Sequence, residues 1–527
     1  RFVQETGSKI MRVALTGATG NMGKETLAEI LKIEELEFVR LLVLPEDKRI
    51  KSLMKKHKKN KQKIQVVFGN LKDRFICEKL VADVDYVFNL AAVIPPLSDK
   101  APKKAIECNQ IGVDALVTAI EALEHQPKLV HISTVALYGN RNYLHPWAKV
   151  GDPLLVSPYD VYSLSKLRGE FRVLESNIDN WVVIRQTAML HKNMLKDNMK
   201  DGLMFHTCFN APLEWVTAED SGVLMANIIK KDITTDLSAF WKNIYNLGGG
   251  LENSITGYDT LNDGFKLIGG STKDFFKPYY NATRNFHGVW FSDGDKLEEL
   301  FHYQSQNVKY YWKQIEKIYW YYKLGKIVPK CLISKFVIKR LFKDSNSPAY
   351  WYKHKETGKL VAYFGSKENY EKLLNYKWKD FPLLVENKDS LGNSIEYSRL
   401  KDKTQSSQIE YFFNYDKKDK EIDIIDLEMV AEAHGGKLLT KSFTTGDIYK
   451  KLEWENQDHQ VFTATAFSVL RGGHWINPTY FDTIWDFDRL AKKDKLYASL
   501  WYDSHEVEEN YIYSMDDAFN TKIEVLK

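Results

Sequence analysis

The sequence predicts an α/β protein in which a doubly wound parallel sheet is followed by a C-terminal α+β region. Over about the first 250 residues, short apolar runs alternate with helical patterns, as parallel strands alternate with their crossover helices. A glycine-rich turn separates the first apolar run from the first helical pattern. The composition changes after about residue 345, and 527 residues are too many for one ordinary core.

The first strand is expected at residues 11–16, MRVALT, a short apolar run. Gly17, Gly20 and Gly23 follow it, and the next segment, KETLAEILKI, repeats apolar residues at helical spacing. Glycines between a strand and a helix let the backbone approach a pyrophosphate, which the helix N-terminus can bind. The same glycines also fit a plain tight turn, so the elements that follow must decide between the two.

Further strands are expected where apolar runs recur, at residues 36–44, 63–71, 85–93 and 127–139. Helical patterns lie between them, including IGVDALVTAIEALE at 111–124. In parallel sheets of this kind, ligands bind beyond the carboxyl ends of the strands. Small or polar residues fall at those ends and leave room for an adenine or a nicotinamide: Asn70, Ala91, Ala92 and Thr134.

A tyrosine and a lysine four residues apart, Tyr162 and Lys166, form the candidate catalytic pair. Residues at this spacing share one face of a helix, and an ammonium beside a phenol lowers the pKa of the phenol. Tyr162 could then act as general acid or base on a carbonyl or carbinol oxygen, to which Thr134 or Ser133 could hydrogen-bond. An exposed helical pair is the alternative, but the pair follows a nucleotide-type turn and a Ser-Thr strand end in the appropriate order.

Together these motifs resemble the extended short-chain dehydrogenases/reductases, the NAD-dependent epimerase/dehydratase family. The resemblance covers residues 11–250 and is expected to continue to about 320. It implies a Rossmann-type sheet with a small substrate lobe built from residues 188–215 and 255–300. The segments that carry it are TGATGNMG (16–23), NLAAV (89–93), Asn109 with Gly112, HISTVALYG (131–139), YSLSK (162–166), WVVIRQT (181–187), EWVTAEDSGVLMANII (214–229) and IYNLGGG (244–250).

The resemblance implies that Thr134, Tyr162 and Lys166 are the catalytic triad and that Lys166 also holds the nicotinamide ribose. It implies further residues around the cofactor. These are Gly17, Gly20, Asn21, Met22 and Gly23 at the pyrophosphate, Asn70 and Leu71 at the adenine, Asn109, and Gln186 and Thr187 near the nicotinamide. Gln186 stands where the family commonly has a proline.

The end of the second strand lacks the acidic residue that would bind a ribose 2′-hydroxyl. Lys48 and Arg49 follow shortly afterwards and would bind a 2′-phosphate. Glu46 or Asp47 could still favour NAD. The balance of these residues favours NADP over NAD as the cofactor.

The activity expected from these features is an NAD(P)-dependent oxidoreductase that transfers hydride to or from a small substrate. One alternative is a sugar-nucleotide epimerase or dehydratase, although the arginine and asparagine pattern for uridine diphosphate is not found. A second alternative is a non-catalytic dinucleotide-binding scaffold. The substrate lobe has apolar residues that fit either an apolar substrate or ordinary core: Met189, Leu190, Met194, Met204, Phe205, Phe209 and Trp215.

Two segments are strongly basic. Residues 51–63, KSLMKKHKKNKQK, are expected to be a solvated helix and loop. Residues 303–343 contain ten basic residues, one acidic residue and many aromatics, with Pro329 between two helical patterns. We expect this segment to pack its aromatics on the reductase domain, and contact with an anionic membrane surface is the alternative.

Three domains are expected: a reductase domain with its lobe (11–320), a helical connector (321–345) and a C-terminal α+β domain (346–527). The third would cover the pocket or mediate assembly. In it, residues 350–365 predict a β-hairpin. Residues 431–478 resemble a treble-clef module that lacks the cysteines for zinc, so we expect structural roles for His434, His459 and His474.

The composition narrows the partners and the compartment. A net charge of +4, from 74 basic and 70 acidic residues, gives no reason to expect nucleic-acid binding. The four cysteines are far apart, which fits a reducing compartment without disulfides or bound metal. No apolar run is long enough for a membrane helix and the N-terminus is polar, so we expect a cytoplasmic protein. A small-molecule substrate is the expected partner, and a homo-oligomer remains open.

Overall fold

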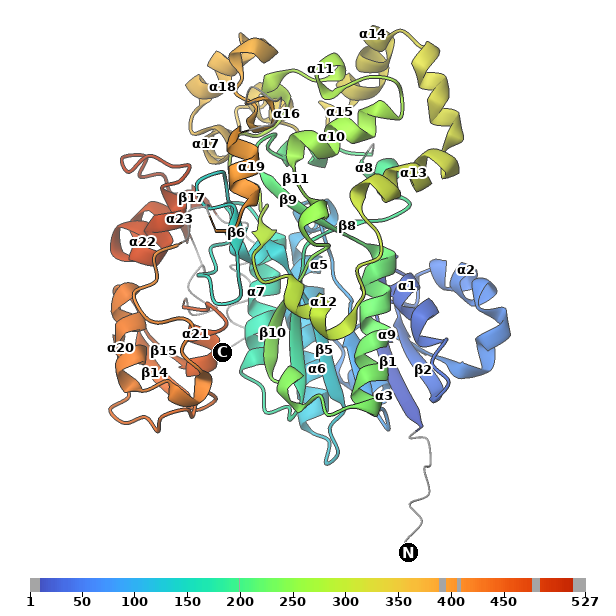
Figure 1. Cartoon of the computed structure of the whole chain (residues 1–527), viewed down its shortest axis with the longest axis vertical. Helices are drawn as coiled ribbons and strands as arrows, with labels where there is room; N and C mark the ends of the chain where they lie inside the picture. The colour runs from blue at the N-terminus through green and yellow to red at the C-terminus, as the bar shows by residue number, and fades with distance from the viewer. Residues whose placement is uncertain (1–9, 199, 388–394, 405–408, 476–483, 515–527) are drawn as a thin grey trace, which may run out of the picture.

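Seven parallel strands form the central sheet of the protein (Figure 1). The computed structural model describes residues 10–198, 200–387, 395–404, 409–475 and 484–514. The spatial order of the strands reverses between β1 and β4, as in doubly wound sheets, and every strand expected before residue 140 is present. In spatial order they are β10 (Asn243–Leu247), β7 (Trp181–Gln186), β5 (Lys128–Thr134), β4 (Tyr86–Asn89), β1 (Met11–Thr16), β2 (Leu36–Val43) and β3 (Ile64–Phe68).

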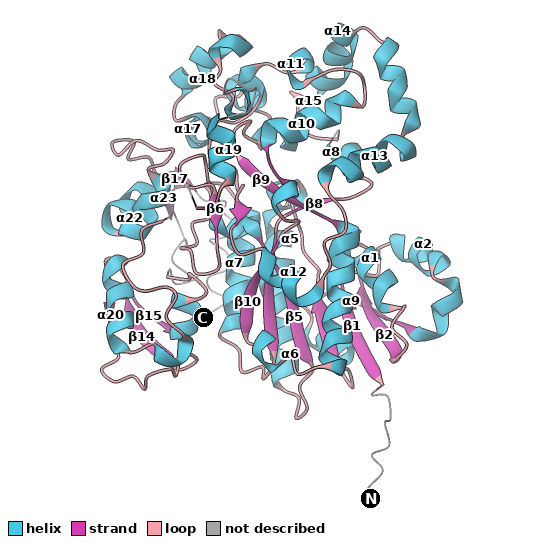
Figure 2. Ribbon diagram, viewed as in Figure 1, coloured by secondary structure: helices cyan, strands magenta, loops and turns pink. Residues whose placement is uncertain are grey.

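Helices cover both faces of this sheet (Figure 2). Along β1, Val13 and Leu15 pack into the core on one face while Ala14 joins the core on the other, as the alternation of a strand requires. The predicted Rossmann-type α/β fold is therefore confirmed. One face carries α1 (Asn21–Ile30), α9 (Ala218–Thr234) and α12 (Asp295–Phe301), and the other carries α3 (Arg74–Val81), α6 (Gly112–Glu121) and α7 (Val161–Leu174).

A lobe of short strands and helices lies beyond the carboxyl ends of the sheet, at the top of Figure 1. Its small sheet has the order β11 (Ser254–Thr256), β9 (Pro212–Thr217), β8 (Ala188–Leu190), and β6 (Trp147–Ala148) pairs with β12 (Trp290–Phe291). Its helices before residue 303 are α4 (Leu97–Lys100), α5 (Pro102–Ile106), α8 (Met194–Asn198), α10 (Gly257–Lys266) and α11 (Thr272–Phe275).

The basic segments differ in how they pack. α2 (Arg49–Lys56) and η1 (Lys58–Lys63) form the expected solvated helix and loop. α13 (Val308–Ile318) buries its aromatic face on the lobe, as predicted, but most side chains from residue 318 to 337 are exposed. The expectation of packing is therefore correct for α13 and for Ile338 and Leu341, and wrong for most of residues 318–337. The exposed part comprises η8 (Trp320–Ile327), α14 (Lys330–Ile333) and most of η9 (Ser334–Ile338), and α15 (Lys339–Leu341) follows.

Residues 350–365 do not form the predicted hairpin. They form α16 (Pro348–Lys353) and α17 (Thr357–Phe364), followed by α18 (Lys367–Leu374). Ser347 caps α16, and the proline at the first helical position is pre-organised for a helix. Leu360 and Phe364, four residues apart, are buried on one face of α17. Helical burial therefore overrides the β-propensity of the aromatic residues in this stretch.

The remaining chain is an α+β region, as predicted, at the left of Figure 1. A helix, an antiparallel hairpin and a second helix occupy residues 424–470. The likeness to a treble-clef module remains a prediction, and its last residues, 476–478, lie outside the described residues. The elements are α19 (Ile395–Lys401), α20 (Ile424–Ala433), β13 (Lys437–Leu438), β14 (Lys451–Glu455), β15 (Val461–Thr465), α21 (Ala466–Leu470), β16 (Ile484–Trp485), α22 (Phe487–Lys493), α23 (Lys495–Trp501) and β17 (Tyr513–Ser514).

The C-terminal region shares its hydrophobic cores with the Rossmann-type domain. Trp485 and Trp351 belong to the same buried cluster as Leu164 of α7. Phe467 lies edge-on to Trp181 of β7, with their ring centroids 5.7 Å apart. The domain boundaries at 320 and 345 remain predictions, but the packing is continuous across both of them.

Candidate active site

The glycine turn joins β1 to α1 and forms one end of the site. Gly17 has φ +70°, and a Cβ atom there would lie 2.8 Å from the Ala91 nitrogen. A Cβ atom on Gly23 would lie 2.1 Å from the Gly17 oxygen. α1 starts after Gly20 without a side-chain cap and without an acidic residue in its first turn. Its first backbone N–H groups and its dipole are therefore available to an anion.

The strand-end residues beside this turn are held by hydrogen bonds. The Ala91 nitrogen donates to Thr16 Oγ1 at 3.0 Å. Asn109 is fully buried; its Oδ1 accepts from the Val93 nitrogen, and its Nδ2 donates to the Val93 oxygen and to Ser165 Oγ. Asn109 therefore holds the segment after β4 against α7 through these hydrogen bonds, and this structural role does not require a cofactor.

At the end of β2, an acid contacts the glycine turn. Thr19 Oγ1 donates to Asp47 Oδ2 at 2.6 Å, and Arg49 makes a two-pronged bond to the same carboxylate at 2.8 Å. The hydrogen bond from Arg49 is the main cause that lowers the pKa of Asp47. Lys48 is an exposed residue at the start of α2. Arg49, which the sequence analysis assigns to a 2′-phosphate, is thus engaged by Asp47.

The two predicted adenine residues lie after β3. Asn70 Oδ1 accepts from the Lys72 nitrogen at 3.1 Å, which closes a local turn. Leu71 is buried. Its side chain lies 3.0 Å from the position that a Cβ atom on Gly112 would occupy. Leu71 therefore packs against α6, and Asn70 shapes the loop after β3.

Thr134 ends β5, and Tyr162 lies in the first turn of α7. Both residues line the same cavity, and the Thr134 side chain is close enough to Tyr162 to act on its pKa, in the lowering direction, so the structure brings these two predicted residues together. Burial raises the pKa of Tyr162 to about 12, and the Asp160 carboxylate acts in the same direction. The expected lowering of this pKa is therefore not found.

Lys166 lies one turn further along α7, but its ammonium is bonded elsewhere. Nζ donates to the Ile132 carbonyl oxygen at 2.5 Å, and the side chain is buried. Burial lowers the pKa of Lys166 to about 8. A helical i, i+4 spacing places two residues on one face, but it does not decide which acceptor the ammonium chooses.

Gln186 ends β7 and Thr187 follows it, and their side chains differ in whether they have a hydrogen-bond partner. Thr187 Oγ1 donates to the Glu214 oxygen at 2.8 Å. Gln186 Oε1 is buried and has no hydrogen-bond partner among the described residues. Because a buried polar atom without a partner costs stability, this oxygen marks a place where a ligand donor would fit.

A cavity of about 660 Å³ joins these parts. This is large enough for a sizeable ligand. The predicted site residues in its wall are Gly17, Gly20, Asn21, Met22, Gly23, Ala92, Thr134, Tyr162, Gln186 and Thr187. The predicted site residues that do not line it are Lys48, Arg49, Asn70, Leu71, Ala91, Asn109 and Lys166.

The apolar residues of the lobe divide between cavity and core. Met189, Met204 and Trp215 line the cavity. The other four members of the set named in the sequence analysis are almost fully buried: Leu190, Met194, Phe205 and Phe209. The interpretation as core therefore holds for these four residues, and contact of the other three with an apolar substrate stays a prediction.

Several cavity residues are ones that the sequence analysis did not name as site residues. His287 Nδ1 bonds Asp160 Oδ2 at 2.8 Å. Burial lowers the pKa of His287, but the Asp160 carboxylate outweighs it, so the net shift is upward. Asp99 also lines the cavity, and burial raises its pKa to about 7. Asp160 caps α7 and could have been found from its position before the helix, whereas His287 and Asp99 carry no sequence signal.

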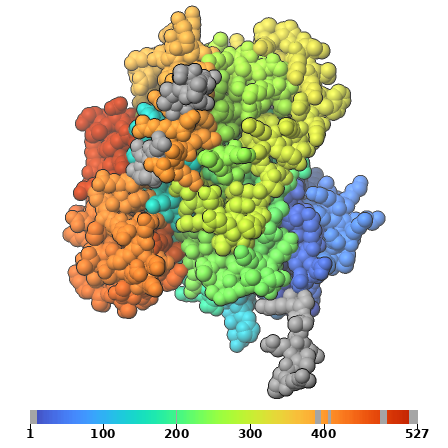
Figure 3. Space-filling model, in the orientation of Figure 1, coloured from blue at the N-terminus to red at the C-terminus, as the bar shows by residue number. Residues whose placement is uncertain are grey.

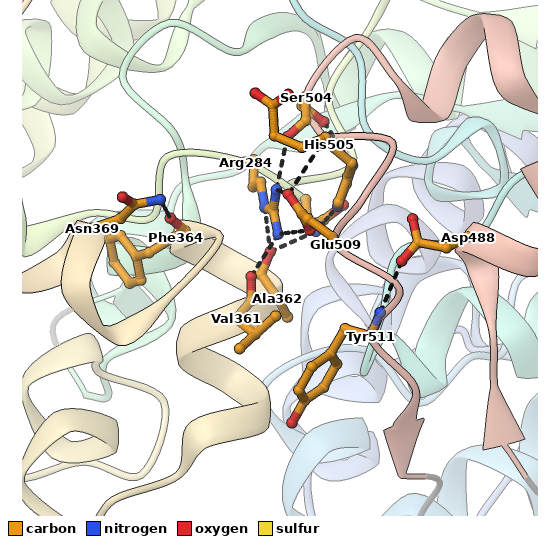
Figure 4. A network of polar contacts seen from close by, with 12 residues as sticks. Arg284, Val361, Ala362, Phe364, Asn369, Asp488, Ser504, His505, Glu509 and Tyr511 are labelled. Atoms are coloured by element: carbon orange, nitrogen blue, oxygen red, sulfur yellow. Dashed lines mark hydrogen bonds and ion pairs between the residues drawn. The ribbon is translucent and has the colours of Figure 1, made fainter.

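The C-terminal region closes the cavity on one side. Its contributions to the wall are Asn346, Trp351, Lys359, Tyr363, Trp485 and Ser514. Arg284, next to the cavity residue Asn285, fastens this side (Figure 4). Its guanidinium donates to both oxygens of Glu509 at 2.6 and 2.8 Å, to the Ser504 oxygen, and to two carbonyl oxygens of α17. A role of this region in covering the pocket thus has a direct structural basis.

The three histidines named in the sequence analysis each hydrogen-bond to a carboxylate. The pairs are His434 with Asp494, His459 with Glu455, and His474 with Glu170. The described residues contain no group of three or more histidine, cysteine or acidic side chains that could hold a metal ion. Within the same residues, no helix has both the length and the apolar character needed to cross a bilayer.

The order of the strands and the glycine turn after β1 give the chain a Rossmann-type fold. Residues 13–182 match the model of the NAD dependent epimerase/dehydratase family, so this part of the chain is similar to that family.

Two curated proteins are similar over part of the chain. An uncharacterized membrane protein of Methanocaldococcus jannaschii is 30% identical over 123 residues, which cover 23% of this chain and 35% of that protein. D-erythronate dehydrogenase of Cupriavidus necator is 26% identical over 161 residues, which cover 30% of this chain and 48% of that protein. The chain thus spans between about a third and about half of the length of these relatives.

Solved structures are also similar to this chain. UDP-glucuronic acid 4-epimerase from Bacillus cereus, in complex with UDP-glucuronic acid and NAD, is 20% identical with a TM-score of 0.46, covering 59% of this chain and 100% of that one. dTDP-glucose 4,6-dehydratase from Bacillus anthracis, in complex with NAD, is 17% identical with a TM-score of 0.46, covering 60% of this chain and 98% of that one.

Proposed function

We propose that this chain is an NAD(P)-dependent oxidoreductase that transfers hydride between the nicotinamide and a carbonyl or hydroxyl carbon of a small substrate. The observation that carries the proposal is the single cavity whose wall includes the glycine turn, Gln186, Thr134 and Tyr162. A dinucleotide, a substrate carbon and a proton donor can meet in one space there.

The residues present fit a nicotinamide dinucleotide. The uncapped N-terminus of α1 offers its N–H groups and dipole to the pyrophosphate. The unpartnered Gln186 Oε1 can accept a hydrogen bond from the carboxamide of the nicotinamide. Lys166 bonds the Ile132 carbonyl oxygen and does not line the cavity, so its ammonium would have to turn toward the cavity to hold the nicotinamide ribose. When bound, the cofactor supplies or accepts the hydride.

Tyr162 is proposed to move the proton. With a pKa raised to about 12, its phenol stays protonated at neutral pH and can donate to a substrate carbonyl oxygen. The Thr134 hydroxyl, which lies near Tyr162, would hydrogen-bond to the same substrate oxygen. The site as built therefore favours reduction of a carbonyl over oxidation of an alcohol.

We propose NAD as the preferred cofactor, because the Asp47 carboxylate lies against Thr19 of the glycine turn. A 2′-phosphate placed there would meet this negative charge, and Arg49 is already paired with it. A carboxylate at this position instead suits a ribose hydroxyl. Lys48 and Arg49 alone favour NADP, and the position of Asp47 reverses that preference.

The substrate is proposed to combine an apolar body with a polar group. Met189, Met204, Leu213 and Trp215 supply apolar wall. His287 and Lys359 bring cationic or hydrogen-bonding groups to the same space, although each is paired with an acid, Asp160 and Glu356 respectively. Because these pairs neutralise the cations, we expect a neutral polar group on the substrate rather than a strongly anionic one.

The second candidate function is that of an epimerase or dehydratase, which the family match over residues 13–182 favours. Such an enzyme uses the same cofactor site but returns the hydride within one turnover. Mixing the protein with candidate substrates separates the two: lasting consumption of reduced nicotinamide indicates a reductase, whereas product without net consumption indicates an epimerase or dehydratase.

Replacing Tyr162 by phenylalanine tests the proposal. Because the variant keeps the ring and loses the transferable proton, we expect turnover to fall by about a hundredfold or more, with the Kd for NAD within about twofold of the parent value. Tyr143→Phe, at a half-exposed tyrosine, is the matched control and should behave as the parent. Full turnover by Tyr162→Phe, or failure of the parent chain to bind either nicotinamide dinucleotide, would refute the proposal.

A further inference from the structure

Residues 318–337 expose an unusual number of large hydrophobic side chains, nine within 20 residues. Ile327 is 81% exposed, and Trp320 and Phe336 are each 65% exposed. Single exposed apolar side chains are ordinary, but a cluster of this kind marks an interaction surface. The nine, which we call the apolar rim, are Ile318, Trp320, Tyr321, Leu324, Ile327, Val328, Leu332, Phe336 and Val337.

The apolar rim is anchored at both ends, so its exposure is not that of a loose segment. Before it, Tyr311, Trp312 and Ile315 of α13 are buried on the lobe, and after it Ile338 and Leu341 are buried. In the middle, Gly325 lies so close to Ile268 that a Cβ atom there would be 2.9 Å away. In Figures 1 and 3 the segment, coloured yellow, forms the upper right edge of the molecule.

Basic side chains surround the apolar rim. Residues 303–343 carry ten basic residues and one acidic residue, Glu316, which pairs with Lys323. Lys330 pairs with Asp274. The other eight basic residues of 303–343 are exposed and form no ion pair within the described part of the chain: Lys309, Lys313, Lys317, Lys326, Lys335, Lys339, Arg340 and Lys343. The surface is therefore apolar and cationic at once.

We propose that residues 318–337 dock this protein on an anionic lipid bilayer. Apolar side chains that enter the region between headgroups and acyl chains, with lysines around them, are the pattern of helices that lie in the bilayer surface. Trp320 and Tyr321 are of the residue types enriched at that depth. The unpaired cations complement anionic headgroups, whereas a purely apolar partner would leave them uncompensated.

Docking in this way would bring the substrate cavity close to the bilayer. Trp312 and Gly264 of α10 are neighbours, and residues 325 and 268 pack together beside the same helix. Thr260 and Leu261 of α10 line the cavity. One helix thus has the docking segment packed beside it and supplies part of the cavity wall. The docking inference stands on the surface alone and does not depend on which reaction the cavity supports.

Sedimentation of the full chain with vesicles tests the proposal. We expect binding to vesicles of phosphatidylcholine mixed with phosphatidylglycerol, weaker binding to phosphatidylcholine alone, and release by high salt. The double variants Ile327→Ser with Phe336→Ser, and Lys326→Glu with Lys339→Glu, should each weaken binding by about tenfold or more. The matched control is Phe75→Ser with Ile425→Ser, at two exposed apolar residues elsewhere, and should bind as the parent does.

Three outcomes would overturn the proposal. The parent chain could fail to bind anionic vesicles, or the rim variants could bind as well as the parent. Alternatively, light scattering could show a dimer that Ile327→Ser with Phe336→Ser converts to a monomer, which would assign the rim to a second copy of the chain. Titration of the same variants with NAD separates this result from the proposed activity, because binding of NAD should be unchanged.

Discussion

Asp47 follows β2 and places a negative charge against Thr19 of the glycine turn. It accepts hydrogen bonds from Thr19 and from Arg49, and its pKa is lowered, so it is ionised at neutral pH. One carboxylate thus orders a turn residue and neutralises a guanidinium. The same charge would repel the additional phosphate of NADP.

The Asp47→Asn variant tests this role. Removing the negative charge frees Arg49 for a 2′-phosphate, so the ratio of the Kd values for NADP and NAD should shift toward NADP by about tenfold. Fluorescence titration with both dinucleotides measures the ratio. Asp263→Asn, which removes an exposed pair with Lys266, is the control and should leave it unchanged. An unaltered ratio in Asp47→Asn would show that Asp47 does not select the cofactor.

At the scale of elements, α7 is fixed by a buried ionic network that includes the C-terminal region. Glu170 of α7 pairs with Arg185 of β7, and both side chains are fully buried. His474 Nε2 bonds Glu170 Oε1 at 2.9 Å, and Arg185 Nη2 donates to the Gly472 oxygen. The helix that carries Tyr162 is therefore held against the sheet from two directions.

Replacing Glu170 by glutamine should destabilise the protein by about 3 kcal/mol or more, because Arg185 would remain buried without its counter-charge. Urea unfolding measures the loss, and Glu78→Gln, in an exposed pair with Arg74, should cost less than about 0.5 kcal/mol.

The network lowers the pKa of Glu170 below its ordinary value of 4.5, although burial alone would raise it. Its contribution to stability is therefore complete above pH 4.5 and is lost as the pH falls toward the lowered pKa. The parent and Glu170→Gln curves should converge in acid. Parallel curves down to the acid transition would contradict this assignment.

At the scale of the whole molecule, the C-terminal region is part of the cavity wall and of two shared cores. Arg284 joins the lobe, α17 and residues 504–509 through one side chain (Figure 4). The planar guanidinium makes these bonds in several directions at once, which a lysine ammonium cannot reproduce.

Arg284→Lys should lower the free energy of unfolding by about 2 kcal/mol and make residues 504–514 more sensitive to protease. Limited proteolysis with mass spectrometry locates the cleavage. Arg12→Lys, in an exposed pair with Glu37, is the control and should behave as the parent. If Arg284→Lys is cleaved no faster than the control, the clamp does not hold this segment.

Local patterns were sufficient for the sheet and for much of the site. The apolar runs predicted β1 to β5, and the glycine spacing predicted the turn that Gly17 makes with φ +70°. Thr134 and Tyr162 were paired from their order in the chain, and the structure places them together in the cavity wall. The strands and the glycine turn depend on residues that are neighbours in the sequence. The meeting of Thr134 and Tyr162 follows from the right-handed crossover of parallel strands, so the sequence is sufficient to predict all three features.

The sequence by itself therefore determined the α/β fold, the turn between β1 and α1, and the residues that meet beyond β5. Only the tertiary structure decided that His287, Trp351 and Trp485 share the same cavity, that Lys166 bonds a backbone carbonyl, and that residues 318–337 face outward. Helical and strand periodicity report which face of an element is buried. They carry no information on which distant element buries it, because that choice depends on packing between segments hundreds of residues apart.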